Sequence, residues 1–148
     1  MFISNLSHYI PADRISNDYF LDVNGLDDEW IYQRTGIKTR SKAAEGENTN
    51  TMGIEACKLL SEKISFPITE VDLIIGATYS PYDTVGTLAH GVQRHLNIPS
   101  AKVISISSAC SSFINALEIV EGYFATGKSE KAIIVASEHN TAYFNPSD

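Results

Sequence analysis

The hydrophobic and polar positions along the chain follow two spacings, which predict strands and helices in alternation. Short, nearly continuous apolar runs are typical of strands that are covered on both faces. Val71–Thr78, with the letters VDLIIGAT, is the clearest of these runs. The predicted strands are Phe2–Ile10, which Pro11 ends, Val71–Thr78, the run through Val103, Ile104 and Ile106, and Lys131–Ser137.

Between these runs, apolar residues recur at intervals of three and four, which predicts helices with one buried face. The predicted helices begin near Asn17, Asp28, Thr51, Val85 and Cys110 and end near Val23, Gly36, Ile64, Leu96 and Phe124. Short polar side chains and glycines mark the ends, with Asn17 and Asp27 or Asp28 as expected N-caps and Gly127 as an expected C-cap. Lys38–Thr49 and Tyr79–Thr84 are expected to be loops. Strands that alternate with helices in this way predict a layered α/β domain with a largely parallel sheet.

The stretch Lys102–Phe124 places a cysteine between a predicted strand and a predicted helix. Small residues just before Cys110 permit a sharp turn, and the positive end of the helix dipole favours a thiolate at that point. Cys110 is therefore a candidate nucleophile. The alternative is that Cys110 is a small buried apolar residue, as most free cysteines are. Cys57 lies on the apolar stripe of its helix and is expected to pack.

Composition limits the possible classes of protein and of partner. The 148 residues are 43% hydrophobic and 20% charged, with a formal net charge of −7, which fits one globular domain of mixed type. Two cysteines far apart suggest neither a disulfide framework nor a metal site, and we expect a cytoplasmic location. Basic residues are scattered and outnumbered, so nucleic acid is not an expected partner. The sequence shows neither a signal peptide nor a membrane span, and no membrane association is expected.

Three motifs resemble the β-ketoacyl-acyl-carrier-protein synthase III family of the thiolase-like superfamily. They are DDEWIYQRTGIKTR at Asp27–Arg40, TMGIEA at Thr51–Ala56 and SISSACSSF at Ser105–Phe113. The resemblance implies a thiolase-like layered fold, with a mixed, mostly parallel sheet and helices on both faces, that forms one half of a duplicated structure. Members of this family condense an acyl-CoA primer with malonyl-acyl-carrier protein and release CO2 and CoA, which starts a fatty-acid chain.

The resemblance also assigns expected roles to particular residues. Cys110 matches the acylated cysteine, while Trp30 and Arg34 match the residues that hold the adenine and phosphates of CoA. Val85 stands where the family often places a phenylalanine in the wall of the acyl pocket. Otherwise Trp30 would be expected to pack in the core and Arg34 to be a solvated charge. No cofactor and no metal are expected, because acyl-CoA is a substrate.

The family's catalytic histidine and asparagine belong to its second half, and no histidine of this chain matches them. We therefore expect residues 1–148 to form an N-terminal domain that carries the nucleophile, with the C-terminal half absent, and to be inactive alone in the full condensation. A homodimer is expected, and a basic patch from Arg34, Lys38, Arg40 and Lys42 could help to bind the acidic carrier protein. Two alternatives remain: a noncatalytic thiolase-like partner subunit, or a related synthase of secondary metabolism or of hydroxymethylglutaryl-CoA formation.

Overall fold

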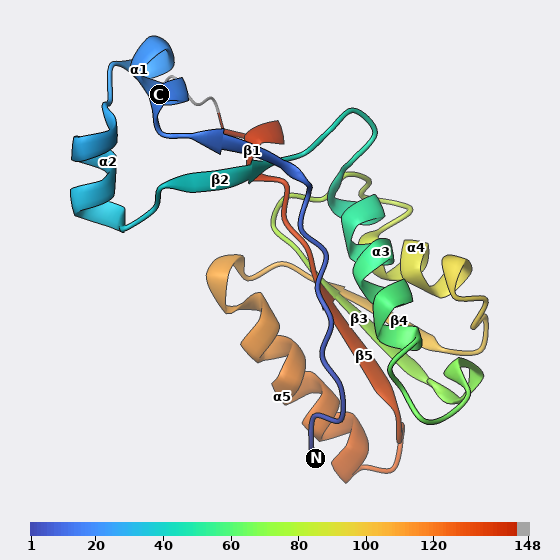
Figure 1. Cartoon of the computed structure of the whole chain (residues 1–148). Coiled ribbons are helices and arrows are strands. Elements are labelled where there is room, and N and C mark those ends of the chain that lie inside the picture. Colours follow the sequence, from blue (N-terminus) through green and yellow to red (C-terminus); the bar gives the residue numbers. More distant parts are fainter. Residues whose placement is uncertain (145–148) are drawn as a thin grey trace. The chain divides into compact units, whose positions relative to one another are not determined.

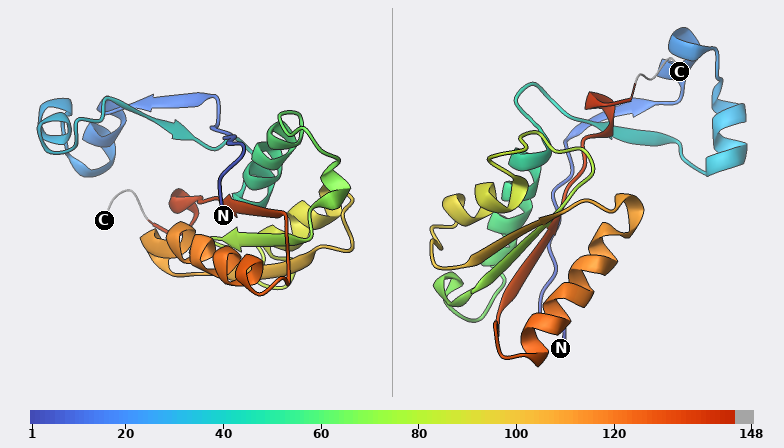
Figure 2. Two further views of the ribbon diagram at one scale, coloured as in Figure 1. Left: turned by 90° about the horizontal axis from the view of Figure 1, so that it is seen from below. Right: turned by 180° about the vertical axis from the view of Figure 1, so that it is seen from behind.

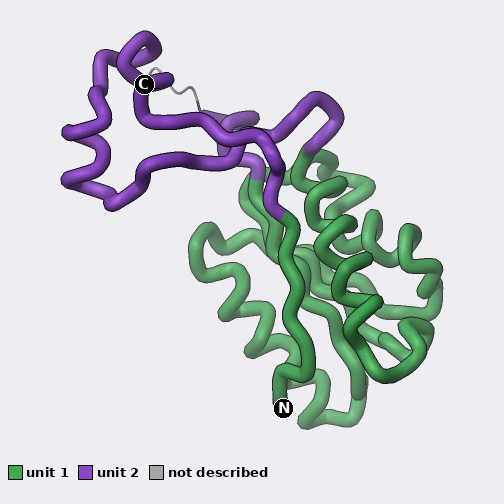
Figure 3. Tube along the Cα trace, in the orientation of Figure 1, with its two compact units in different colours: residues 1–9, 48–138 green, residues 10–47, 139–148 purple. Residues whose placement is uncertain are grey.

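The computed structural model describes residues 1–144, and the chain divides into two compact units (Figures 1 and 3). The sheet unit comprises Met1–Tyr9 and Asn48–Glu138, and the hairpin unit comprises Ile10–Glu47 and the chain from His139 onward. The strands are β1 (Asp13–Ser16), β2 (Thr39–Lys42), β3 (Leu73–Ala77), β4 (Lys102–Ile106) and β5 (Ala132–Ala136). The helices are α1 (Asp18–Asn24), α2 (Asp28–Thr35), α3 (Thr49–Ser61), α4 (Leu88–His95) and α5 (Ser112–Ala125). Short 3₁₀ turns are η1 (Ile68–Glu70), η2 (Ala109–Ser111) and η3 (Asn140–Ala142).

The sheet unit is built on three parallel strands in the order β4-β3-β5. Leu73 at the start of β3 is level with Lys102 of β4 and Ala132 of β5, so the three strands begin and end together. β3 is buried along its whole length, as its continuous apolar sequence predicts. The carboxyl ends of all three strands therefore meet at one edge of the sheet.

Helices cover both faces of this sheet, as the sequence predicts (Figure 2). Alternate residues of β3 point to opposite faces, so Ile74 packs with α3 and α4 while Leu73 and Ile75 pack with α5. The buried cores on the two faces are Cys57, Val71, Ile74, Leu88, Ala89, Val92, Ile98, Ala101, Ile133 and Val135 on one side, and Leu73, Ile75, Ala116 and Val120 on the other.

Two glycines allow the helices on the α3 and α4 face to approach closely. A Cβ atom at Gly76 of β3 would lie 2.8 Å from the backbone nitrogen of Ala89 in α4. A Cβ atom at Gly53 of α3 would lie 2.5 Å from Cδ1 of Leu88. Both contacts are shorter than packed atoms permit, so a larger residue would require α4 to move at Gly76 and at least the Leu88 side chain to move at Gly53.

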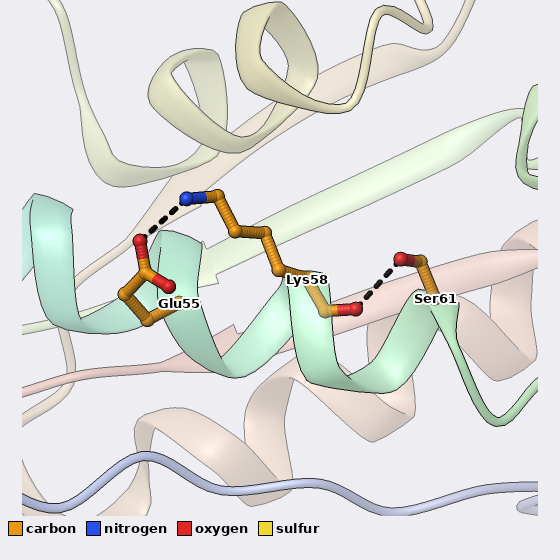
Figure 4. Close-up of polar contacts among 3 residues, drawn as sticks. All are labelled: Glu55, Lys58 and Ser61. Atoms are coloured by element: carbon orange, nitrogen blue, oxygen red, sulfur yellow. Dashed lines mark hydrogen bonds and ion pairs between the residues drawn. The ribbon is translucent and has the colours of Figure 1, made fainter.

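Helix α3 begins at Thr49, two residues before the expected start at Thr51, because its cap is Asn48. The Asn48 side chain accepts hydrogen bonds from the backbone of Asn50 and Thr51, and the Thr51 hydroxyl accepts one from the Asn48 N–H, which completes a capping box. Figure 4 shows the other end, where Lys58 Nζ lies 2.6 Å from Glu55 Oε1 and Ser61 Oγ donates to the Lys58 carbonyl. The exposed ion pair contributes about 0.2–0.5 kcal/mol at most.

The hairpin unit contains two strands that the sequence pattern did not predict. β1 and β2 pair antiparallel, with Asp13 opposite Lys42 and Ser16 opposite Thr39. The prediction that Lys38–Thr49 is a loop is therefore wrong for β2. A polar strand such as TRSK has no apolar alternation to reveal it, and its pairing with β1 depends on residues more than twenty positions away.

Three other sequence predictions also need correction. Phe2–Ile10 is not a strand in the structure, and Phe2 is 85% exposed, because an apolar run forms a strand only where a neighbour completes its hydrogen bonds. The strand through Val103 is partly exposed rather than buried, since β4 is paired only with β3 among residues 1–144. Helix α4 begins at Leu88, so Val85 lies in the preceding loop and not in the helix.

Candidate active site

Cys110 lies on a tight turn at the carboxyl edge of the sheet. It occupies the middle of η2, four residues after β4 ends at Ile106 and two before α5 begins at Ser112. This is the strand, turn and helix order that the sequence predicts. The Cys110 side chain is exposed, so the alternative of a buried packing cysteine is wrong. A thiol in this position is open to a substrate approaching the strand ends.

Serine hydroxyls hold the turn in shape. Ser112 is 4% exposed, and its hydroxyl accepts from the Ser108 N–H at 2.7 Å and donates to the Ala109 carbonyl at 2.8 Å. The Ser111 hydroxyl donates to the Ser108 carbonyl at 2.7 Å. Ala109 has a φ of +48°, a conformation that costs energy in any residue with a Cβ atom. The hydroxyl bonds on either side of Cys110 stabilise this strained backbone.

The loop of residues 78–87 leaves the neighbouring strand at the same edge. The Thr78 N–H donates to the Ile106 carbonyl at 3.1 Å, which joins the start of this loop to the end of β4. Val85 lies on the loop with 87% of its surface exposed. The Asp83 carboxylate accepts from the Val85 N–H at 2.8 Å, and hydrogen bonds from the Val85 and Gly86 backbones lower the pKa of Asp83.

A glutamate that sequence reasoning missed joins the third strand to this loop. Glu138 lies two residues after β5 ends at Ala136, and its carboxylate accepts from the backbone of Tyr79 and Ser80. The signal that could have found it is its place, because polar residues just after a parallel strand meet those of the neighbouring strands. Glu138, the 78–87 loop and the Cys110 turn thus share one edge of the sheet unit.

Trp30 and Arg34 form a stacked pair on α2 of the hairpin unit. The Arg34 guanidinium carbon lies 4.2 Å from the centre of the Trp30 ring, and Arg34 Nη1 donates to the Trp30 carbonyl at 3.2 Å. Trp30 is 43% exposed, so the core-packing alternative for it is wrong. The Asp27 carboxylate accepts from the Trp30 N–H at 2.7 Å, which confirms Asp27 as the helix cap. The pair offers an aromatic face and a cation to an anionic, ring-bearing ligand.

Asn17 holds the hairpin unit together and does not serve as the helix cap that the sequence predicts. Its backbone is helical and its side chain makes no capping bond to α1. The side chain is 1% exposed and instead donates to the Asp28 carboxylate at 2.8 Å and to the Ile37 carbonyl at 2.7 Å. It also accepts from Arg40 Nη1 at 3.1 Å, and the Arg40 guanidinium stacks 4.4 Å above the Phe20 ring. Arg40 is therefore engaged in structural contacts at the end of the motif.

The two cysteines differ in environment. Cys57 is 3% exposed in the core against α4, and burial raises the pKa of its thiol to about 12. Its packing role is the one that the sequence predicts. Cys110 is the exposed thiol of the sheet unit.

An apolar groove of about 600 Å³ runs beside α5 in the sheet unit. Its walls are the N-terminal segment 1–6, one face of α5 and residues near the start of β5. Cys110 and Val85 are not among the residues that line it. Within residues 1–144, no group of three His, Cys, Asp or Glu side chains is placed to hold a metal ion. None of the helices described there has the length and apolar character to cross a bilayer.

The cysteine turn lies in a segment that is similar to a known family. The family described as 3-oxoacyl-(acyl-carrier-protein) synthase III matches residues 104–148. The β-ketoacyl-acyl-carrier-protein synthase III of Anaplasma marginale (strain St. Maries) is 39% identical over 130 residues, which are 88% of this chain and 40% of that protein. The chain thus spans less than half the length of the curated relatives that it matches.

Solved structures agree with this similarity. The crystal structure of 3-oxoacyl-acyl-carrier-protein synthase III from Aquifex aeolicus VF5 matches with a TM-score of 0.90 and 32% identity over 96% of this chain and 46% of that one. A priming β-ketosynthase from a polyketide biosynthetic pathway matches with a TM-score of 0.90 and 27% identity over 97% of this chain and 43% of that one. The resemblance stated from the sequence motifs is confirmed, and so is the thiolase-like fold.

Proposed function

We propose that this chain, a relative of β-ketoacyl-acyl-carrier-protein synthase III, is the N-terminal half of a condensing enzyme and carries its acyl-transfer step. The observation that carries the proposal is the exposed Cys110 on a strained turn at the carboxyl edge of a parallel sheet, inside the segment that the family description matches. Open α/β sheets bind their ligands at this edge.

The proposed step is a thioester exchange. The Cys110 thiolate attacks the carbonyl carbon of an acyl-CoA, a new carbon–sulfur bond forms, and the bond to the CoA sulfur breaks, so that CoA leaves as a thiolate that takes up a proton. The oxyanion that forms on the way needs hydrogen-bond donors, and backbone N–H groups near the start of α5 are proposed to supply them. The acyl group would then pass to malonyl-acyl-carrier protein, with loss of CO2.

Trp30 and Arg34 are proposed to hold CoA. The indole can stack on the adenine ring, and the guanidinium can pair with phosphate oxygens through charge-assisted hydrogen bonds. Arg34 already stacks on Trp30, which places the cation and the aromatic ring on one surface of α2. The basic residues from Arg34 to Lys42 contribute local positive charge that favours an acidic carrier protein.

Decarboxylation requires a histidine and an asparagine that this chain does not match, and we propose that a C-terminal half supplies them. Residues 1–148 alone would then acylate Cys110 without completing the condensation. We also propose a homodimer in the cytoplasm that continues the sheet across β4, whose outer edge is unpaired among the described residues. Light scattering should show a dimer or a larger species, and a monomer at high concentration would contradict this assembly.

The experiment that tests the proposed function is acylation by short acyl-CoAs, with the modified residue located by mass spectrometry. We expect an acyl adduct on Cys110 that is lost in Cys110→Ser and is unaffected in Cys57→Ser. Arg34→Ala should raise the acyl-CoA concentration needed for half-maximal labelling about tenfold or more, since it removes a charged hydrogen bond. An adduct on Cys57 alone would exclude Cys110 as the nucleophile. Full-length protein that binds acyl-CoA without forming any adduct would favour the noncatalytic partner subunit instead.

Val85 is proposed to widen the acyl pocket. A valine where the family often has phenylalanine leaves room, and each methylene that a longer primer buries gains about 0.8 kcal/mol. Two or three methylenes would change relative kcat/KM by about one to two orders of magnitude. We expect the full-length enzyme to accept primers longer than acetyl-CoA and Val85→Phe to shift the profile toward acetyl-CoA. A strong acetyl preference that Val85→Phe leaves unchanged would remove Val85 from this role.

A synthase of secondary metabolism remains a second candidate, because the priming ketosynthase of a polyketide pathway matches this chain as well in structure as the fatty-acid enzymes do. The cysteine step would be the same and the acceptor would differ. A comparison of malonyl thioesters carried on fatty-acid and polyketide carrier proteins, with Cys110 already acylated, distinguishes the two.

A further inference from the structure

The Glu138 carboxylate accepts four hydrogen bonds at the edge of the sheet unit. One carboxylate oxygen accepts from the Tyr79 N–H at 3.1 Å. The other accepts from the Ser80 N–H at 3.1 Å, from the Ser80 hydroxyl, and from the Thr78 hydroxyl at 3.1 Å. Ser80 is fully buried, so its donors depend on protein acceptors. One carboxylate therefore holds three consecutive residues at the start of the 78–87 loop.

The remainder of the loop is held by other side chains. The buried Thr49 hydroxyl donates to the Ser80 carbonyl at 2.6 Å, and Asn50 Nδ2 donates to the Gly86 carbonyl at 3.0 Å. The Asp83 carboxylate accepts from the Val85 N–H. Glu138 and Thr49 thus hold the start of the loop and Asn50 holds its end at Gly86, and the exposed Val85 lies between these contacts.

The contacts of Glu138 go to the loop and not to the sheet. The ladder between β3 and β5 ends with Ala77 opposite Ala136, two residues before Glu138. Glu138 is itself exposed, so its side chain adds little to the apolar core. The Thr78 that it binds also donates through its backbone to Ile106, at the end of the strand that leads to Cys110. Glu138 therefore binds the loop at a residue that is itself hydrogen-bonded to the end of β4.

We propose that Glu138 is a positioning residue that sets acyl-primer selectivity by holding residues 78–80, and through them the loop that carries Val85. This inference rests on the proposed function, because the role of Val85 in the acyl pocket comes from it. A displacement of about 1 Å in a wall of a binding site is enough to change rates up to 100-fold, so a loosened anchor has a measurable effect on selectivity. Glu138 acts through the loop and is not proposed to touch the substrate.

Two substitutions at Glu138 remove different numbers of these hydrogen bonds. Glu138→Ala removes all four bonds. Glu138→Gln keeps the shape and one carbonyl oxygen, which can still accept from Ser80, while the amide NH2 faces the Tyr79 N–H and cannot accept from it. Glu121→Ala and Glu121→Gln are matched controls, because Glu121 is an exposed glutamate on α5 of the same unit. The glutamine variant also carries the test if the alanine variant does not fold.

The experiment measures two quantities on the full-length protein. Hydrogen–deuterium exchange is followed in peptides that cover residues 78–87, and acylation of Cys110 is followed with a primer series from acetyl-CoA to octanoyl-CoA. We expect faster exchange in Glu138→Ala and a ratio of kcat/KM between the best and worst primers that shrinks about tenfold or more. Glu138→Gln should fall between that variant and the wild type. Both Glu121 variants should match the wild type in both measurements.

The outcomes separate this inference from the proposed function. Faster exchange with an unchanged primer ratio overturns the selectivity role of Glu138, and unchanged exchange overturns its positioning role. A wild-type protein that never acylates Cys110 overturns the proposed function and the selectivity role together, and the exchange data then still decide whether Glu138 holds the loop. Faster exchange and a flattened profile, both confined to the Glu138 variants, support the inference.

Discussion

Substituting alanine for Gly76 tests whether the approach of α4 to β3 depends on the missing side chain. The added Cβ atom would lie 2.8 Å from the backbone nitrogen of Ala89 and 3.0 Å from its Cβ atom. Backbone atoms cannot rotate away as the end of a side chain can, so α4 must shift by a few tenths of an ångström. Ala89 is fully buried, and the shift disturbs the core that α4 shares with the sheet. Overpacking of this kind costs about 1–3 kcal/mol, and we expect the upper part of that range.

Two other glycines supply the comparison. Gly122 lies in α5 with nothing within 4 Å of its added Cβ atom, so Gly122→Ala should stabilise the protein by up to about 1 kcal/mol through helix propensity. Gly53→Ala should fall between the two, because the atom 2.5 Å away is Cδ1 of Leu88, the flexible end of a side chain.

Urea denaturation followed by far-UV circular dichroism measures the three free energies of unfolding. The slope of each transition must be compared with the wild type, since a changed slope would mean a changed unfolded or folded state and not only a changed stability. We expect the order Gly122→Ala, wild type, Gly53→Ala, Gly76→Ala from most to least stable. A midpoint for Gly76→Ala equal to that of the wild type would refute the argument that backbone contact sets the spacing.

Three further predictions follow from the hydrogen bonds and pKa values. With a pKa near 12, only about one Cys57 thiol in ten thousand is ionised at pH 8. Iodoacetamide should therefore modify the exposed Cys110 and leave Cys57 unmodified until urea unfolds the protein. Equal labelling of both cysteines by mass spectrometry would contradict this. Asn17→Ala should lower the stability of the hairpin unit by about 2–4 kcal/mol, because three buried hydrogen bonds lose their shared partner. The fluorescence of Trp30, the one tryptophan, reports the unfolding of this unit in a urea titration. An unchanged urea midpoint would refute the prediction. Because the folded-state pKa of Asp83 is lowered, its stabilising contribution is complete above its unfolded-state pKa of about 4 and is lost as pH falls through the lower folded-state value. The amide resonances of its loop should report that titration at acid pH, and Asp83→Asn should abolish it.

The sequence was sufficient to predict the features of the structure that depend on neighbours along the chain. Asp27 caps α2, and Gly25 and Gly36 end α1 and α2 in the left-handed conformation, each by bonds that span three or four residues. The buried β3 also followed from its sequence, because a strand covered on both faces must be apolar throughout. The turn that presents Cys110 followed from small residues between an apolar run and a helical pattern.

Contacts between residues that are distant in the sequence could not be predicted from local sequence patterns. β1 and β2 are short and polar, and each is a strand only because the other supplies its hydrogen bonds. Asn17 was expected to cap a helix, because an asparagine before a helix usually does so. Its buried side chain instead forms hydrogen bonds with Asp28, Ile37 and Arg40.

The sequence by itself determined the order of strands and helices from α3 to β5, the position of Cys110 at a strand-to-helix turn and the motifs of Trp30 and Arg34, because each depends on spacing within a short segment. Only the tertiary structure decided that Cys110 is exposed and that Glu138 binds the loop of Val85. The parallel register brings the carboxyl ends of β3, β4 and β5 to one edge of the sheet. Glu138 therefore contacts residues that lie about sixty positions away in the sequence.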